Sequence, residues 1–250
     1  MEILGVIPAR FASTRLPGKP LLRATGKTLI QHVFEAASQA RLISRLLVAT
    51  DDPRIAAAVH DFGGTALLTR PDHPSGTDRV AEVAAASPSA DLIVNIQGDE
   101  PELSPHSLDL AIHTLLHNPH AAISTLATPI HDPSLFQDPS CVKVVTDSLG
   151  HALYFSRAPI PFHRDGPPPN SPLGLLHLGL YAYRRSALLQ LASLPPSPLE
   201  RAERLEQLRA LQARLPIAVA LVDEPSVGID TPDDYRRFVD RWTARQAPPH

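Results

Sequence analysis

The chain lacks the features that define several broad classes of protein. Cys141 is its only cysteine, so internal disulfides and thiolate metal clusters are excluded. It contains no run of 18 apolar residues and no signal-peptide pattern at its start, and we expect a soluble, cytoplasmic protein that does not enter a membrane. A net charge of only −3 disfavours a general role at nucleic acids or membrane surfaces.

Two familiar phosphate-binding motifs are also missing. The sequence has no G-x-x-x-x-G-K-[ST] run, which argues against a P-loop, and no G-x-G-x-x-G run, which argues against a Rossmann dinucleotide site. Any binding of phosphate must therefore depend on other residues.

Strand-like and helix-like patterns alternate through the first 120 residues of the 250-residue chain. This alternation predicts an α/β fold with a doubly wound, mainly parallel, Rossmann-like sheet. The second half has strand patterns without long helices between them, which indicates antiparallel additions. We therefore expect one domain over residues 1–250, containing a less regular antiparallel subdomain at about 130–195. A single helix is predicted over residues 198–213, where an apolar stripe recurs at helical spacing.

A basic loop follows the first predicted strand, which covers residues 3–7 and which Pro8 is expected to stop. The loop carries Arg10, Arg15 and Lys19, and ligands of open α/β sheets bind at the carboxyl ends of strands. Guanidinium groups pair bidentately with phosphate oxygens, so the loop suits a triphosphate or diphosphate. A solvated basic loop without a ligand explains the pattern equally well.

Two carboxylates occupy comparable positions far apart in the sequence. Asp99 follows a buried strand at residues 92–96, and Asp230 comes just before a helix that Thr231 caps. Together they would suit Mg²⁺, which prefers oxygen ligands and retains water or substrate phosphates. Taken singly, each is better explained as a turn or helix-start residue.

Other polar residues leave two interpretations open. Ser75 and Gly76 lead into a helix and either approach a nucleotide base or simply begin that helix. Arg157 ends a strand and suits either a carboxylate ligand or a surface ion pair. His177 has the pattern of a structural histidine, and the pair at residues 206–207 lies off the apolar stripe of the predicted helix, as solvated side chains do.

Taken together, these segments resemble the sugar-acid cytidylyltransferases, and more narrowly the branch that uses 3-deoxy-manno-octulosonate (Kdo). The resemblance spans nearly the whole chain in order. The segments at 155–157, 177 and 206–207 favour the Kdo branch. The matching segments are residues 7–10, 13–20, 49–51, 72–77, 95–101, 142–145, 152–157, 177–181, 196–200, 205–209 and 228–233.

The resemblance implies that CTP and Kdo react to give CMP-Kdo and diphosphate, with Mg²⁺, in lipopolysaccharide biosynthesis. It further implies a cytoplasmic homodimer and a set of residue roles. The implied catalytic residues are Arg10, Lys19, Asp99 and Asp230, of which Asp99 and Asp230 would hold the metal. The implied nucleotide-binding residues are Arg10, Arg15, Lys19, Arg70, Ser75 and Gly76, and the implied sugar-binding residues are Gln97, Arg157, His177, Tyr181, Glu206 and Gln207.

Alternatives of different classes stay open at this point. A cytidylyltransferase for another acid, such as sialic acid or 8-amino-Kdo, would share most of the motifs. A binding or regulatory protein could keep the fold without catalysis, although the intact Arg10, Lys19, Asp99 and Asp230 argue against it. A nucleic-acid-binding module is disfavoured by the net charge.

Overall fold

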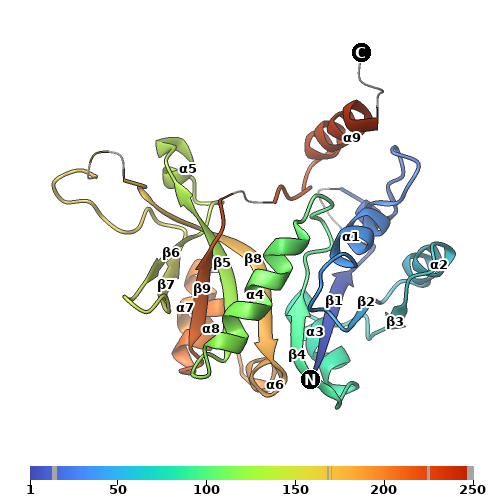
Figure 1. Ribbon diagram of the computed structural model, residues 1–250, viewed down its shortest axis with the longest axis horizontal. Helices are drawn as coiled ribbons and strands as arrows, with labels where there is room; N and C mark the ends of the chain where they lie inside the picture. The colour runs from blue at the N-terminus through green and yellow to red at the C-terminus, as the bar shows by residue number, and fades with distance from the viewer. Residues whose placement is uncertain (13–15, 168, 170, 224–225, 247–250) are drawn as a thin grey trace. The chain divides into compact units, whose positions relative to one another are not determined.

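The computed structural model describes residues 1–12, 16–167, 169, 171–223 and 226–246 (Figure 1). The chain divides into two compact units. The first unit comprises Met1–Ala90, Asn95–His106 and Ser226–His250, and the second comprises Asp91–Val94 and Ser107–Pro225. The prediction of one domain with a subdomain at about 130–195 stays a prediction.

The first unit contains a parallel set of three strands, drawn in blue and teal in Figure 1. Strand β1 (Glu2–Ala9) pairs with β2 (Arg45–Thr50), and β2 pairs with β3 (Ala66–Leu68). The registers align Val6 with Leu47 and Val48 with Ala66. Apolar residues of β1 are almost wholly buried, which makes this strand the core of the unit.

The first unit also contains helices. They are α1 (Leu29–Ala37), α2 (Pro53–Asp61), α3 (Gly76–Ala85) and α9 (Pro232–Gln246), with a 3-10 turn η1 at Lys19–Leu21. Asp52 caps α2 by accepting from the Arg54 N–H, and Thr231 accepts from the Asp234 N–H in the same way. These side chains satisfy amide groups that the helix itself leaves unpaired.

The second unit combines parallel and antiparallel pairs. Strand β5 (Ile123–Ile130) pairs antiparallel with β8 (Gly174–Arg184) and parallel with β9 (Ile217–Leu221). Strand β6 (Lys143–Thr146) pairs antiparallel with both β7 (Ala152–Ser156) and β8. The predicted α/β class, with antiparallel additions to a parallel sheet, is therefore confirmed.

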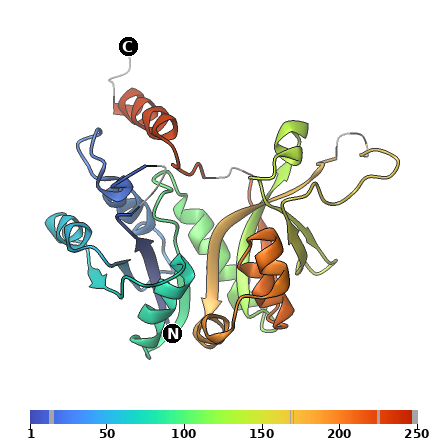
Figure 2. The ribbon, with the colours of Figure 1, turned by 180° about the vertical axis from the view of Figure 1, so that it is seen from behind.

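The remaining elements are strand β4 and five helices of the described residues, and Figure 2 shows the ribbon from the opposite side. Helix α8 packs against β7. Strand β4 covers Ala90–Asn95, and the helices are α4 (Pro105–His117), α5 (Pro133–Gln137), α6 (Arg185–Ser193), α7 (Pro198–Glu203) and α8 (Gln207–Gln212). Over the described residues, no helix combines the length and the apolar character needed to cross a bilayer.

Two predicted element boundaries are wrong. Pro8 does not stop the first strand, because its fixed φ lies within the extended region, and Pro8 stays in register with Ala49. The helix predicted over residues 198–213 is two helices, because Arg204 adopts a left-handed conformation with φ 54° and ψ 50°. Glu206 is consequently the N-cap residue of α8 rather than an interior helical residue.

Candidate active site

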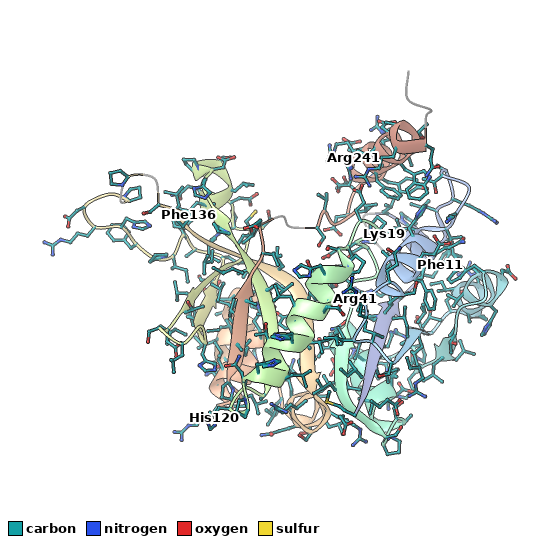
Figure 3. The ribbon with its side chains drawn as sticks, viewed as in Figure 1. Phe11, Lys19, Arg41, His120, Phe136 and Arg241 are labelled. Atoms are coloured by element: carbon teal, nitrogen blue, oxygen red, sulfur yellow. The ribbon has the colours of Figure 1, made fainter. Side chains whose placement is uncertain are left out.

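Lys19 joins the two predicted metal-binding carboxylates. Its ammonium donates to Asp99 Oδ2 at 2.8 Å, to the Ile229 carbonyl at 2.7 Å and to Asp230 Oδ1 at 3.4 Å. The Lys19 side chain is only 14% exposed, whereas Asp99 and Asp230 are 30% and 46% exposed. Lys19, labelled in Figure 3, therefore brings together three segments that are distant in the sequence.

Two glycines allow these segments to meet. Gly18 has a left-handed φ of 65°, which turns the chain into η1 immediately before Lys19. A Cβ at Gly98 would lie 2.8 Å from the Pro8 carbonyl oxygen, so the segment before Asp99 fits closely against β1 only without a side chain. The Ile229 N–H then donates to the Asp99 carbonyl at 2.9 Å and draws in the segment of Asp230.

A cavity of about 410 Å³ opens over this cluster in the first unit. Seven of the residues predicted from the sequence line it, and they come from five segments. These are Arg10, Lys19, Ser75, Gly76, Gln97, Asp99 and Asp230. Because the residues predicted for phosphate, base and metal gather around one cavity, the sequence motifs describe a common site.

Two predicted nucleotide-binding residues are not placed in this cavity. Arg15 lies outside the described residues. The Arg70 side chain is 68% exposed, and its guanidinium lies 3.5 Å from Asp72 and 3.9 Å from Glu82 rather than in the cavity lining. Arg70 is therefore a surface residue of the loop that precedes α3.

The start of α3 faces the cavity. Ser75 is the N-cap residue: its Oγ accepts from the Asp78 N–H at 3.2 Å and donates to Asp78 Oδ2 at 2.7 Å. Gly76, the first residue of this ten-residue helix, lines the cavity as well. The N-terminal end of a helix carries partial positive charge, so this end favours an anion in the cavity. The capping and binding interpretations of Ser75 are thus compatible.

Sequence reasoning missed two cavity residues, His73 and Arg79. The His73 Nε2 contacts Glu82, and Arg79 donates to Thr69 Oγ1 at 2.5 Å. Burial raises the pKa of Glu82, but hydrogen bonds from His73 and from a backbone N–H outweigh burial and lower this pKa. Arg79 is only 4% exposed. Arginine is seldom fully buried without a partner, so its position on the buried side of the predicted helix could have marked it as a site residue.

Asp99 borders a second carboxyl group with an unusual environment. Burial raises the pKa of Glu100 to about 7, with a further contribution from the negative charge of Asp99, against a hydrogen bond from Ser226. Glu100 thus carries a proton more readily than an exposed glutamate, which lessens the negative charge beside Asp99.

In the second unit, His177 and Tyr181 form a ring cluster on β8. The His177 ring lies 4.9 Å from the Phe155 ring and 5.4 Å from the Tyr181 ring, centroid to centroid. Its Nε2 lies 3.0 Å from Thr125 Oγ1. Burial lowers the pKa of His177 to about 3 and raises the pKa of Tyr181, so both side chains are neutral near pH 7. Neutral rings of this kind suit hydroxyl groups rather than a charged partner.

The other predicted sugar-binding residues lie near the segment where α7 ends and α8 begins. Glu203 accepts a hydrogen bond from the Arg157 N–H at 2.9 Å, and the charge of Glu206 acts on Tyr181. Gln207 is buried at the start of α8. Arg157, His177, Tyr181, Glu206 and Gln207 therefore belong to the second unit, whereas Gln97 belongs to the first.

Asp99 and Asp230 fit a hard divalent cation. Both carboxylates already meet the same ammonium group, so the protein gathers two negative oxygen donors at one point. Among the described residues, no group of three or more histidine, cysteine or acidic side chains is arranged to hold a metal. A bound cation would therefore take its other ligands from water or phosphate, as Mg²⁺ commonly does.

Known proteins match this chain over nearly its full length. The family pattern described as cytidylyltransferase matches residues 4–217. The 3-deoxy-manno-octulosonate cytidylyltransferase of Syntrophotalea carbinolica is 52% identical over 95% of this chain and 97% of that protein. The protein of the same name from Solibacter usitatus is 51% identical over 94% of this chain and 92% of that protein.

A solved structure with a similar name also matches the fold of this chain. The structure of CMP:2-keto-3-deoxy-manno-octonic acid synthetase complexed with CTP superposes with a TM-score of 0.93 and is 42% identical. The match covers 98% of this chain and all of that one, at 100%. Sequence and structure therefore lead to the same group of proteins.

Proposed function

Because the chain belongs to the cytidylyltransferase family, we propose that it transfers the cytidylyl group of CTP to Kdo, giving CMP-Kdo and diphosphate. The observation that carries the proposal is the cavity in which Lys19 joins Asp99 and Asp230 beside Arg10 and the start of α3. Close relatives named for this reaction support the choice of substrates. In that role the chain would act in lipopolysaccharide biosynthesis.

Arg10 and Lys19 would bind the triphosphate of CTP, together with Arg15. Preorganised positive charge stabilises the negative charge that develops on the phosphates and on the departing diphosphate. The N-terminal end of α3, at Ser75 and Gly76, would face the cytidine side. Arg70 could join them only if its exposed guanidinium turned away from Asp72 and Glu82.

Mg²⁺ is the cofactor that we propose, with Asp99 and Asp230 as its protein ligands. When bound, it supplies Lewis-acid chemistry and neutralises charge on the phosphates. Lys19 contacts both carboxylates, so its ammonium would hold them together and balance their charge. It would thereby position the two ligands as well as contact the nucleotide.

For the sugar acid, the family resemblance implies Gln97 and a separate set of residues in the second unit. Arg157 would bind the carboxylate of Kdo, because a guanidinium matches two carboxylate oxygens. His177 and Tyr181 are neutral and would exchange hydrogen bonds with sugar hydroxyls, as would Glu206 and Gln207. Holding the acid in one orientation favours in-line attack of its anomeric hydroxyl on the α-phosphorus, which releases diphosphate.

A cytoplasmic homodimer completes the proposal. Both features come from the family resemblance, and fractionation of cells and sedimentation of the purified protein test them separately. A monomer at micromolar concentration would contradict the dimer without affecting the proposed reaction.

The decisive experiment measures diphosphate release across a panel of nucleotides and acids. CTP, UTP, ATP and GTP are each combined with Kdo, 8-amino-Kdo or sialic acid in the presence of Mg²⁺. The proposal expects the highest kcat/KM for CTP with Kdo and no release when either is omitted. A higher kcat/KM with another acid would reassign the substrate, and no release from folded protein with any pair would indicate a binding protein.

A further inference from the structure

Arg157 is held at four points in the second unit. Its backbone N–H donates to Glu203 Oε2 at 2.9 Å, and its carbonyl accepts from Lys143 Nζ at 2.7 Å. Its guanidinium donates from Nε to the Glu203 carbonyl at 2.8 Å and from Nη1 to the Pro139 carbonyl at 2.8 Å. Backbone and side chain are thus both fixed.

The guanidinium of Arg157 donates to backbone carbonyls rather than to a carboxylate. Within the described part of the chain, the groups that accept from its guanidinium are the backbone carbonyls of Glu203 and Pro139. The Glu203 carboxylate instead accepts from Ser156 Oγ at 2.6 Å and from the Arg157 N–H. Burial raises the pKa of the Glu203 carboxyl, but these hydrogen bonds and the positive charge of the nearby Arg157 outweigh burial and lower this pKa, without a direct ion pair between the two described side chains. The guanidinium is therefore oriented by carbonyl groups, and its other N–H donors can bind an external anion.

Lys143 supports the same arrangement from the other side. It is completely buried, at 0% exposed, and its ammonium donates to three backbone carbonyls, those of Asp138 at 2.9 Å, Cys141 at 2.5 Å and Arg157 at 2.7 Å. A buried lysine is costly because its charge leaves water. Its contacts tie residues 138–141, which include the Pro139 carbonyl that holds the guanidinium, to the backbone of Arg157.

We propose that Lys143 and Glu203 are positioning residues that orient the Arg157 guanidinium for the carboxylate of the sugar-acid substrate. The proposal rests on the proposed function, which gives Arg157 that ligand. Neither residue touches the substrate. Each acts by holding Arg157 or the turn beneath it, so that the side chain does not have to be ordered when the acid binds.

The first test replaces Lys143 with methionine, which has a similar length but neither charge nor donor. Lys143→Met is expected to raise the KM for Kdo about tenfold, because hydrogen bonds to charged groups that fix Arg157 are lost. The KM for CTP is expected to stay unchanged. Lys27→Met is the matched control, because Lys27 is a half-exposed lysine of the first unit that pairs with Glu35. It should change neither constant.

A double-mutant cycle separates positioning from general stability. Arg157→Ala is expected to raise the KM for Kdo more than Lys143→Met does. In the Arg157→Ala background, Lys143→Met should add little, because the side chain that it positions is already gone. Full additivity, or an unchanged KM for Kdo in Lys143→Met, would overturn the proposal.

Glu203→Ala provides a second route if Lys143→Met does not fold. It removes the carboxylate that accepts from Ser156 and Arg157 but keeps the Glu203 carbonyl. A raised KM for Kdo with an unchanged KM for CTP supports the proposal, and equal effects on both substrates contradict it. If Arg157→Ala leaves the KM for Kdo unchanged while CMP-Kdo is still formed, the positioning proposal fails and the proposed function stands. If wild-type protein forms no CMP-sugar, the proposed function fails.

Discussion

Replacing Lys19 with methionine perturbs both the stability and the chemistry of the first unit. The variant leaves Asp99 and Asp230 near each other without the ammonium that now contacts both, and it removes a donor from the Ile229 carbonyl. Breaking a buried ion pair costs about 3–5 kcal/mol, whereas an exposed pair contributes about 0–1 kcal/mol. With Asp99 and Asp230 partly exposed, we expect the free energy of unfolding to fall by about 2 kcal/mol.

Urea denaturation measures this loss, and Lys27→Met is again the control. Lys27 pairs with Glu35 at 2.6 Å, but both side chains are roughly two-fifths exposed, at 38% and 41%, so the control should lose under about 1 kcal/mol. Equal losses in the two variants would refute the view that Lys19 balances the two carboxylates.

The same variant tests cation binding without requiring turnover. When the ammonium is absent, Asp99 and Asp230 lose the positive charge that balances them, so Mg²⁺ should raise the urea midpoint of Lys19→Met more than that of wild type. Losing one preorganised positive group commonly slows the chemical step about 100-fold or more, so we expect kcat of Lys19→Met to fall by about that factor. Near-normal turnover, or a midpoint insensitive to Mg²⁺ in both proteins, would contradict the proposed roles.

Three further predictions concern individual contacts. Two nitrogens of the Arg209 guanidinium donate to the buried Glu200 carboxylate at 2.5 and 2.8 Å. Arg209→Met leaves this carboxylate without that partner, so urea denaturation should show a fall of about 3–5 kcal/mol in the free energy of unfolding. A loss of about 0–1 kcal/mol, as for an exposed pair, would contradict this. The pKa of His177 is lowered to about 3, so its NMR signals should not titrate between pH 5.5 and 8. Between pH 6.5 and 3 the unfolded chain binds a proton at His177 that the folded protein does not. The contribution of neutral His177 to the free energy of unfolding is therefore fully present above its unfolded pKa of 6.5, and it is lost as the pH falls toward its folded pKa of about 3. Gly98→Ala should cost about 1–3 kcal/mol through its clash with β1, whereas Gly228→Ala, which meets nothing within 4 Å, should cost far less in thermal denaturation.

Local chemistry made much of the first unit predictable. Ser75 and Thr231 precede predicted helices, and their side chains cap α3 and α9 in the structure. The carboxyl ends of parallel strands lie at the same edge of a sheet, and this rule placed Arg10, Lys19 and Asp99 in one predicted phosphate and metal site. In the structure all three line one cavity.

Features that depend on tertiary contacts were not predictable in this way. The apolar stripe over residues 198–213 continues through both α7 and α8, so periodicity could not reveal the left-handed Arg204 between them. Lys19 was assigned to phosphate alone, because spacing shows no partner 80 residues away, whereas the structure places it on Asp99. The buried positions of Lys143 and Arg79 are set by distant carbonyl and hydroxyl groups that no local pattern encodes.

The most direct test of the proposed reaction is ³¹P NMR of the products. Purified protein is incubated with CTP, Kdo and Mg²⁺, and each component is omitted in turn. The account predicts a new phosphodiester signal from CMP-Kdo that grows in step with diphosphate and appears only in the complete mixture. Diphosphate together with free CMP, or no change in the CTP signals with folded protein, would contradict transfer to the sugar acid.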